Sequence, residues 1–108
     1  MAKAAVYNNG ILAGTLEKRA PDEYLFIYDD NYLADALNPS ISLSLPKSRK
    51  EHKSSTLFSF FYGLLAEGIN KDIQCRLLRI DGEDDFTRLV KTAGHDTIGA
   101  ITVKEIIE

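Results

Sequence analysis

The residues that could perform acid–base or metal chemistry are few in this chain and lie far apart. His52 and His95 have no second histidine and no cysteine at the spacing of a zinc site. His95 precedes Asp96, which suggests an oriented base, but neighbours in sequence seldom face each other as a catalytic triad requires. We therefore expect His95 to lie in a loop, and we expect no zinc site.

A second group with chemical potential is the acidic cluster around Gly82, formed by Asp81, Glu83, Asp84 and Asp85. The cluster lacks the ligand pattern of a calcium-binding EF-hand loop. Capping of the helix that follows, with negative charge near its N-terminus, explains these acids without a metal. The glycines do not follow the spacing of a phosphate-binding or dinucleotide-binding loop either. The sequence thus predicts no catalytic residue, no metal ion and no cofactor.

The single basic run spans 47–53, and Glu51 interrupts it; its cations are Lys47, Arg49, Lys50 and Lys53. Such a run is most often a solvated loop, and the alternative is contact with DNA or with an acidic partner surface. The formal net charge of −3 argues against a nucleic-acid binder, because phosphate neutralisation needs a concentrated basic face.

The turn predicted at 66–70 is a candidate for binding a partner protein. Ile69 either packs just past a helix C-terminus or protrudes as an apolar anchor, and the residues alone do not decide between the two. The candidate partner-binding residues are Tyr62, Ala66, Glu67, Gly68, Ile69 and Asn70.

The apolar stretch 57–68 supplies the predicted centre of the core. Its apolar residues recur at the spacing of one helical stripe, which Phe58 and Tyr62 widen. We expect Ser54 or Ser55 to cap this helix and Gly68 to end it in a left-handed conformation. The stripe consists of Leu57, Phe60, Phe61, Leu64 and Leu65.

The first half of the chain predicts strands. Asn9-Gly10 suits a type I′ turn, so strands at 4–7 and 11–16 form a hairpin. A polar loop is expected at 17–23, followed by a strand at 24–28 that buries either Leu25 and Ile27 or its aromatic residues. The alternation at 41–46 predicts a short strand with one wet face, which Pro46 ends or keeps at an edge.

Helices are predicted before and after the central one. Asp29 or Asp30 caps a short helix that Asn38-Pro39 stops, and its apolar residues are Tyr32, Leu33, Ala36 and Leu37. Asn70 opens a helix from 71 to about 79, with Ile73, Leu77 and Ile80 on one side. Asp84 or Asp85 caps a further helix that Gly94 closes, and its apolar residues are Phe86, Leu89, Val90 and Ala93.

A last strand is expected at 99–103. Strands and helices are largely segregated, which predicts an α+β fold, with a mostly antiparallel small sheet packed on a layer of three helices.

The 108 residues fit a single domain, 1–108, with 44% hydrophobic and 27% charged residues. Cys75 is the one cysteine, so no internal disulfide can form, and a reducing cytoplasm is the expected location. Cys75 itself is expected to be a small core residue. We see no leader and no apolar run of bilayer length, and expect no membrane contact.

Several segments, in this order, resemble the N-terminal subdomain of HipA-type serine/threonine kinases. They are Asn9-Gly10, Leu12-Ala13-Gly14-Thr15-Leu16, Phe26-x-Tyr28, Ile41-Ser42-Leu43-Ser44-Leu45-Pro46, the run from Phe60 to Gly68, Phe86-Thr87-Arg88-Leu89, and the run from Gly94 to Ala100. The resemblance covers essentially the whole chain. Ala66 departs from it where the family often has proline before Glu-Gly, and Ile69 departs where an aromatic residue commonly follows.

In the usual family member a kinase body follows, and none of its catalytic motifs occurs before Glu108. A stand-alone copy looks like HipS of the tripartite HipBST toxin–antitoxin systems, in which HipT is a separate kinase toxin and HipB carries a helix-turn-helix. The resemblance implies a cytoplasmic antitoxin, not an enzyme, that binds and neutralises a HipT-like kinase by docking near its active site. Contact with a HipB-like protein, and with DNA only through the complex, is also implied.

Two other functions stay open. The chain could be the accessory N-terminal lobe of a full-length HipA-like kinase. Alternatively it could be a DNA- or repressor-contacting adaptor that uses the basic run to assist a HipB-like repressor. An enzyme in its own right is not expected, because no nucleophile, base and oxyanion donors can be assembled from these residues.

Overall fold

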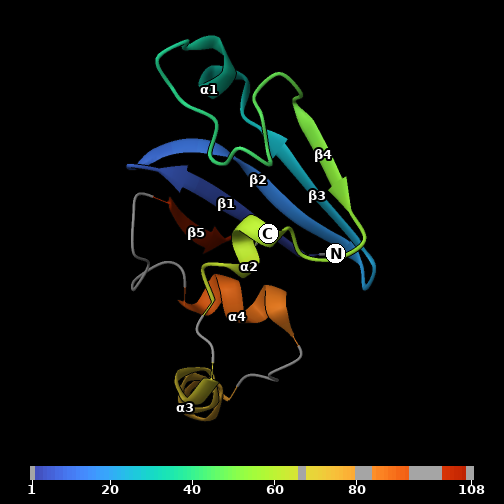
Figure 1. Ribbon diagram of the computed structural model, residues 1–108, viewed down its shortest axis with the longest axis vertical. Helices are drawn as coiled ribbons and strands as arrows, with labels where there is room; N and C mark the ends of the chain where they lie inside the picture. Colours follow the sequence, from blue (N-terminus) through green and yellow to red (C-terminus); the bar gives the residue numbers. More distant parts are fainter. Residues whose placement is uncertain (1, 66–67, 80–83, 93–100, 107–108) are drawn as a thin grey trace.

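The computed structural model describes residues 2–65, 68–79, 84–92 and 101–106, and in these residues the chain forms an antiparallel sheet with helices (Figure 1). The strands are β1 (Ala2–Asn8), β2 (Ile11–Ala20), β3 (Glu23–Tyr28), β4 (Glu51–Ser54) and β5 (Ile101–Glu105). Their order across the sheet is β4-β3-β2-β1-β5. The predicted α+β fold with an antiparallel sheet is thus confirmed.

The two hairpins of the sheet differ in how well the sequence predicted them. The first is confirmed, because Asn9 and Gly10 both take the positive φ values of a type I′ turn, 52° and 81°. The loop expected at 17–23 is wrong, since β2 continues to Ala20 and the chain turns at Pro21 and Asp22. Glu17 and Lys18 pair with β1 on one side and with β3 on the other, so ladder hydrogen bonds outweigh their polar character.

The strand β3 buries its aromatic face. Tyr24, Phe26 and Tyr28 belong to the hydrophobic core, whereas Leu25 is buried outside that cluster and Ile27 is half-buried. The Phe26 and Tyr28 rings meet edge to face, with centroids 4.9 Å apart. Gly14 on β2 makes room for this packing, because a Cβ there would lie 2.4 Å from the Ile27 carbonyl oxygen.

The segment between β3 and β4 wraps around a tyrosine hydroxyl. The helix α1 (Asp30–Ala34) is capped by Asp29, as predicted, but it ends before Ala36 and Leu37. The strand predicted at 41–46 is wrong, since these residues form a turn with a single bridge between Ser42 and Leu45.

The physical reason for this turn is the buried hydroxyl of Tyr28. The hydroxyl accepts a hydrogen bond from the Ile41 N–H at 3.1 Å and donates one to the Leu45 carbonyl oxygen. Ile41 and Leu45 are therefore buried, whereas Leu43 at the tip of the turn is fully exposed. Burial raises the pKa of Tyr28, so the hydroxyl keeps its proton across the physiological range.

The central helix is much shorter than the sequence predicted. The helix α2 (Ser59–Tyr62) begins after Phe58, with no side-chain cap from Ser54 or Ser55, and Gly63 is right-handed. The N–H groups of Leu64 and Leu65 bond three residues back, which tightens the chain after α2. The apolar stripe nevertheless packs as expected: Leu57, Phe61 and Leu65 are buried, and Phe58, Phe60 and Leu64 pack against them.

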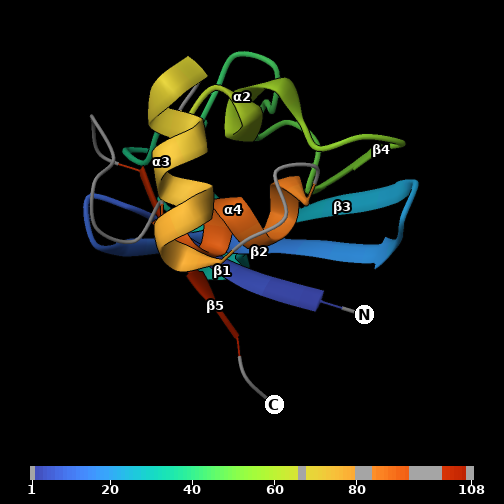
Figure 2. The same ribbon diagram turned by 90° about the horizontal axis from the view of Figure 1, so that it is seen from below.

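Two longer helices follow, and only one of them contributes strongly to the core. The helix α3 (Gly68–Leu78) begins at Gly68, the residue expected to end the central helix. The helix α4 (Asp85–Thr92) buries Phe86 and Leu89 and packs Val90 against the core, as predicted. In Figures 1 and 2, α2 and α4 lie next to the sheet and α3 lies outside α4. The helical layer on the sheet is therefore thinner than the three helices expected.

Several expectations fall on residues outside the described ranges, and the structure leaves them as predictions. They concern Ile80, Asp81, Gly82, Glu83, Ala93, Gly94, His95, Asp96, Gly99 and Ala100. Among the described residues, no helix has the length and apolar character needed to cross a membrane.

Replacing Phe61 with alanine is expected to lower the free energy of unfolding by about 3–5 kcal/mol, because the ring is fully buried among Phe26, Phe58 and Phe60. Urea unfolding followed by circular dichroism measures this change. Leu43→Ala is the matched control, and its change should stay within about 0.5 kcal/mol since Leu43 is exposed. Similar losses in both variants would contradict a core centred on Phe61.

The cap of α4 makes stability depend on pH. Partial burial acts to raise the pKa of Asp84, but hydrogen bonds from the Thr87 hydroxyl and backbone N–H outweigh it and lower the pKa below its ordinary value. A lowered pKa stabilises the folded state above the unfolded value of about 4, and this contribution is lost as the pH falls through the folded pKa.

The Asp84→Ala variant is therefore expected to be less stable than the wild type by about 1 kcal/mol at pH 7. The difference should narrow on acidification toward about pH 2.5, because protonation of the Asp84 carboxylate removes the charged cap from the wild type. Urea unfolding at both pH values measures it, and an equal difference at the two would contradict the role of the charged cap.

Candidate partner-binding site

The corner singled out by the sequence lies between α2 and α3. Tyr62 is the last residue of α2 and is 43% exposed. Gly68, Ile69 and Asn70 form the first turn of α3, whereas Ala66 and Glu67 lie outside the described residues. The turn expected at 66–70 is therefore wrong at residues 68–70, which already belong to α3, while the protrusion of Ile69 stays a prediction.

An exposed apolar face on α3 adjoins this corner, and we call Ile73, Leu77 and Leu78 the α3 face. Their side chains are 46%, 76% and 46% exposed, although all three are large and apolar. A helix of 11 residues is about the length that is only marginally stable without packing. Figure 2 shows α3 on the outside of the domain, in agreement with the exposure of these three side chains.

The sequence placed Ile73 and Leu77 on one side of a helix but did not predict that they would be exposed. The signal lies in their neighbours, because exposed charges at Asp72, Arg76 and Arg79 leave an apolar stripe too narrow for a buried helix. Cys75, expected in the core, is only half-buried.

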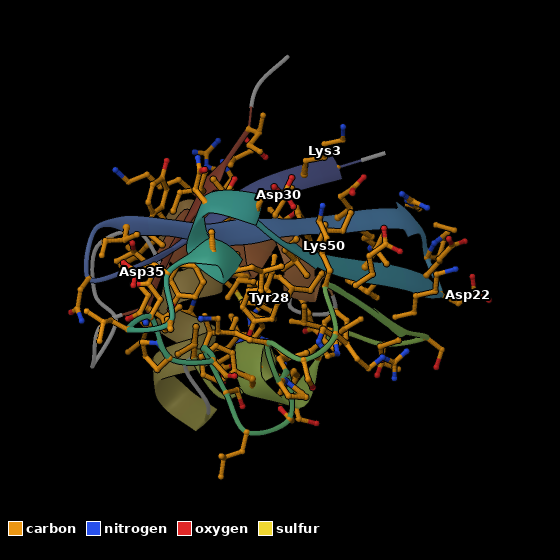
Figure 3. All side chains as sticks on the ribbon, turned by 90° about the horizontal axis from the view of Figure 1, so that it is seen from above. Lys3, Asp22, Tyr28, Asp30, Asp35 and Lys50 are labelled. Atoms are coloured by element: carbon orange, nitrogen blue, oxygen red, sulfur yellow. The ribbon has the colours of Figure 1, made fainter. Side chains whose placement is uncertain are left out.

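The basic run does not form one cationic surface. Lys47 Nζ donates to the carbonyl oxygens of Asp35 and Asn38 at 3.0 and 2.6 Å and lies over the Tyr32 ring. Lys50 Nζ pairs with Asp30 Oδ1 at 2.6 Å (Figure 3), and that hydrogen bond raises the pKa of Lys50. These two cations are therefore engaged by the chain's own oxygens.

The rest of the basic run borders a groove of about 450 Å³ beside β4, and its exposed cations are Arg49 and Lys53. The expected solvated loop is partly wrong, since Glu51–Ser54 form β4. His52 points inward, and its Nε2 lies 3.0 Å from the carbonyl oxygens of both Pro46 and Arg49. Its environment is that of a structural histidine, and the described residues hold no cluster of three or more metal-ligating side chains.

Known proteins share this fold and part of this sequence. Residues 4–104 match the family described as HipA N-terminal domain. An uncharacterized protein of Haemophilus influenzae is 33% identical over 75 residues, which cover 69% of this chain and 70% of that protein. A solved structure, the N-terminal domain of HipA toxin, aligns over 100% of this chain and 95% of that chain, with a TM-score of 0.74 and 26% identity. This chain therefore belongs to the HipA N-terminal domain family.

Proposed function

We propose that this domain binds a HipA-like serine/threonine kinase toxin encoded as a separate chain, of the HipT type, and neutralises it as a HipS-like antitoxin. The domain acts by recognition, and the catalytic body belongs to the kinase. Family membership supports this role, because the matching solved structure is a domain of a HipA toxin. A domain of this family is an accessory lobe and not the catalytic part.

The exposed apolar surface at the corner between α2 and α3 carries this proposal. Tyr62 and the α3 face offer apolar area that the domain itself does not cover. Full burial of a side chain such as leucine or isoleucine contributes about 1.5–3 kcal/mol, so a partner that covers this surface gains several such increments. Large apolar side chains that cluster on a surface are typical of protein–protein contacts.

The first turn of α3 is the part of the domain that we place against the kinase. In the proposed complex Ile69 is the anchor that approaches the active-site cleft, and Glu67 and Asn70 flank it. Docking at the cleft would block substrate access without any chemistry by this domain. A HipB-like repressor and DNA would join only through the complex, a view supported by the internal partners of Lys47 and Lys50.

Replacing Ile69 with aspartate is expected to weaken inhibition of the kinase at least about tenfold, because a charge would be buried in an apolar contact. The measurement is kinase autophosphorylation titrated with the purified domain, with circular dichroism to verify the fold. Leu37→Asp is the matched control, since Leu37 is an exposed apolar residue in the loop after α1. This variant should inhibit the kinase as well as the wild type does.

The possible results distinguish the role of Ile69 as an anchor from the antitoxin function of the domain. Full inhibition by Ile69→Asp would refute the anchor but leave the antitoxin role standing. A wild-type domain that neither binds nor inhibits a HipA-like kinase, or that transfers phosphate from ATP by itself, would refute the function.

A further inference from the structure

The strand β4 is an edge of the sheet, and half of its main-chain groups point away from β3. The Tyr28 N–H donates to the Lys50 carbonyl oxygen at 2.9 Å, which marks these two residues as a hydrogen-bonded pair. Hydrogen-bonded pairs alternate along an antiparallel ladder, so His52 and Ser54 also face β3, opposite Phe26 and Tyr24. The main-chain N–H and C=O groups of Glu51 and Lys53 therefore point outward.

These outward groups are available to another chain. Within the described residues no hydrogen bond outside the sheet ladder uses the main chain of Glu51 or Lys53, and no strand lies beyond β4 in the sheet order (Figure 1). An edge of this kind is a template for pairing with a further strand. The edge is only four residues long, a length that limits uncontrolled pairing between copies of the chain.

The groove beside β4 provides the second half of a peptide site. Besides the whole of β4, it is lined by Ser44 and Leu45 from the turn around Tyr28 and by residues 56–59 that lead into α2. Leu45 and Leu57 belong to this lining but are themselves buried, so the exposed wall of the groove is mostly polar. Alternate side chains of an added strand point to the same face, so one set can enter this groove while the main chain pairs with β4.

The charged residues that border the groove indicate which kind of peptide segment would bind there. Arg49 and Lys53 are exposed, and neither forms an ion pair within the described part of the chain. One acid, Glu51, lies beside them in the groove lining. The local excess of positive charge favours an acidic segment, although the whole chain carries a net charge of −3.

We propose that an extended, acidic segment of the partner kinase adds to the outer edge of β4 as a further strand. Its main chain bonds to Glu51 and Lys53, and its carboxylates face Arg49 and Lys53. This inference rests on the proposed function, and it adds a second contact to the one made by the corner between α2 and α3. The added strand would fix the orientation of the domain on the kinase, while the α3 face supplies apolar burial.

The test compares Lys53→Pro with Lys53→Ala in kinase binding, measured by isothermal titration calorimetry. Proline removes the outward N–H and is tolerated on edge strands, because the N–H of residue 53 takes no part in pairing with β3. Alanine removes the charged side chain but keeps the outward N–H. We expect Lys53→Pro to weaken binding at least about tenfold and Lys53→Ala by no more than about threefold. Arg49→Ala should resemble Lys53→Ala.

Amide hydrogen exchange of the wild-type domain, read by NMR, decides the matter even if Lys53→Pro fails to fold. Exchange at Glu51 and Lys53 should be fast in the free domain and at least about tenfold slower in the kinase complex. Unchanged exchange at both amides, or a folded Lys53→Pro that binds like the wild type, overturns the inference while the kinase partnership survives. Dimerisation of the free domain through β4 also overturns it. Absence of kinase binding by the wild type refutes the proposed function and this inference together.

Discussion

The hydrogen bonds of one buried hydroxyl hold the irregular segment between α1 and β4 against the sheet. Tyr28 lies at the end of β3, with its ring in the core between Phe26 and Tyr32. Its hydroxyl forms hydrogen bonds with main-chain groups on both sides of the turn at 41–45. Buried polar groups without partners are costly, so the tyrosine favours the packing of this irregular segment by satisfying the Ile41 N–H and the Leu45 carbonyl oxygen.

Local signals explain what the sequence predicted well. Asn9-Gly10 requires positive φ at both residues, Asp84 offers a carboxylate to the first turn of α4, and Phe86 and Leu89 recur at helical spacing. Each of these features is decided within a few residues. The α+β class follows from the same local elements, because segregated strands and helices favour an antiparallel sheet with helices on it.

Contacts between distant residues explain what the sequence did not predict. The alternation at 41–46 is typical of a strand, yet bonds to Tyr28 and the close approach of Ser42 to Leu45 make it a turn. The inward residue of β4 is His52 and not an apolar one, so the strand carries no visible alternation. The candidate site divides in the same way: a helix that follows the apolar stretch was predictable from local pattern, whereas its start at Gly68 and the exposure of the α3 face depend on the rest of the domain.

The pairing of β5 with β1 has a consequence for synthesis on the ribosome. The strands β1 to β4 each pair with a neighbour in sequence, but Ile101–Glu105 lies against Ala4–Asn8, from the opposite end of the domain. A nascent chain can form most of the sheet early, whereas the β1 edge stays open until residues 101–105 have left the exit tunnel. Completion of the sheet therefore follows synthesis of the rest of the domain, and the side of the core that Val103 fills is closed last.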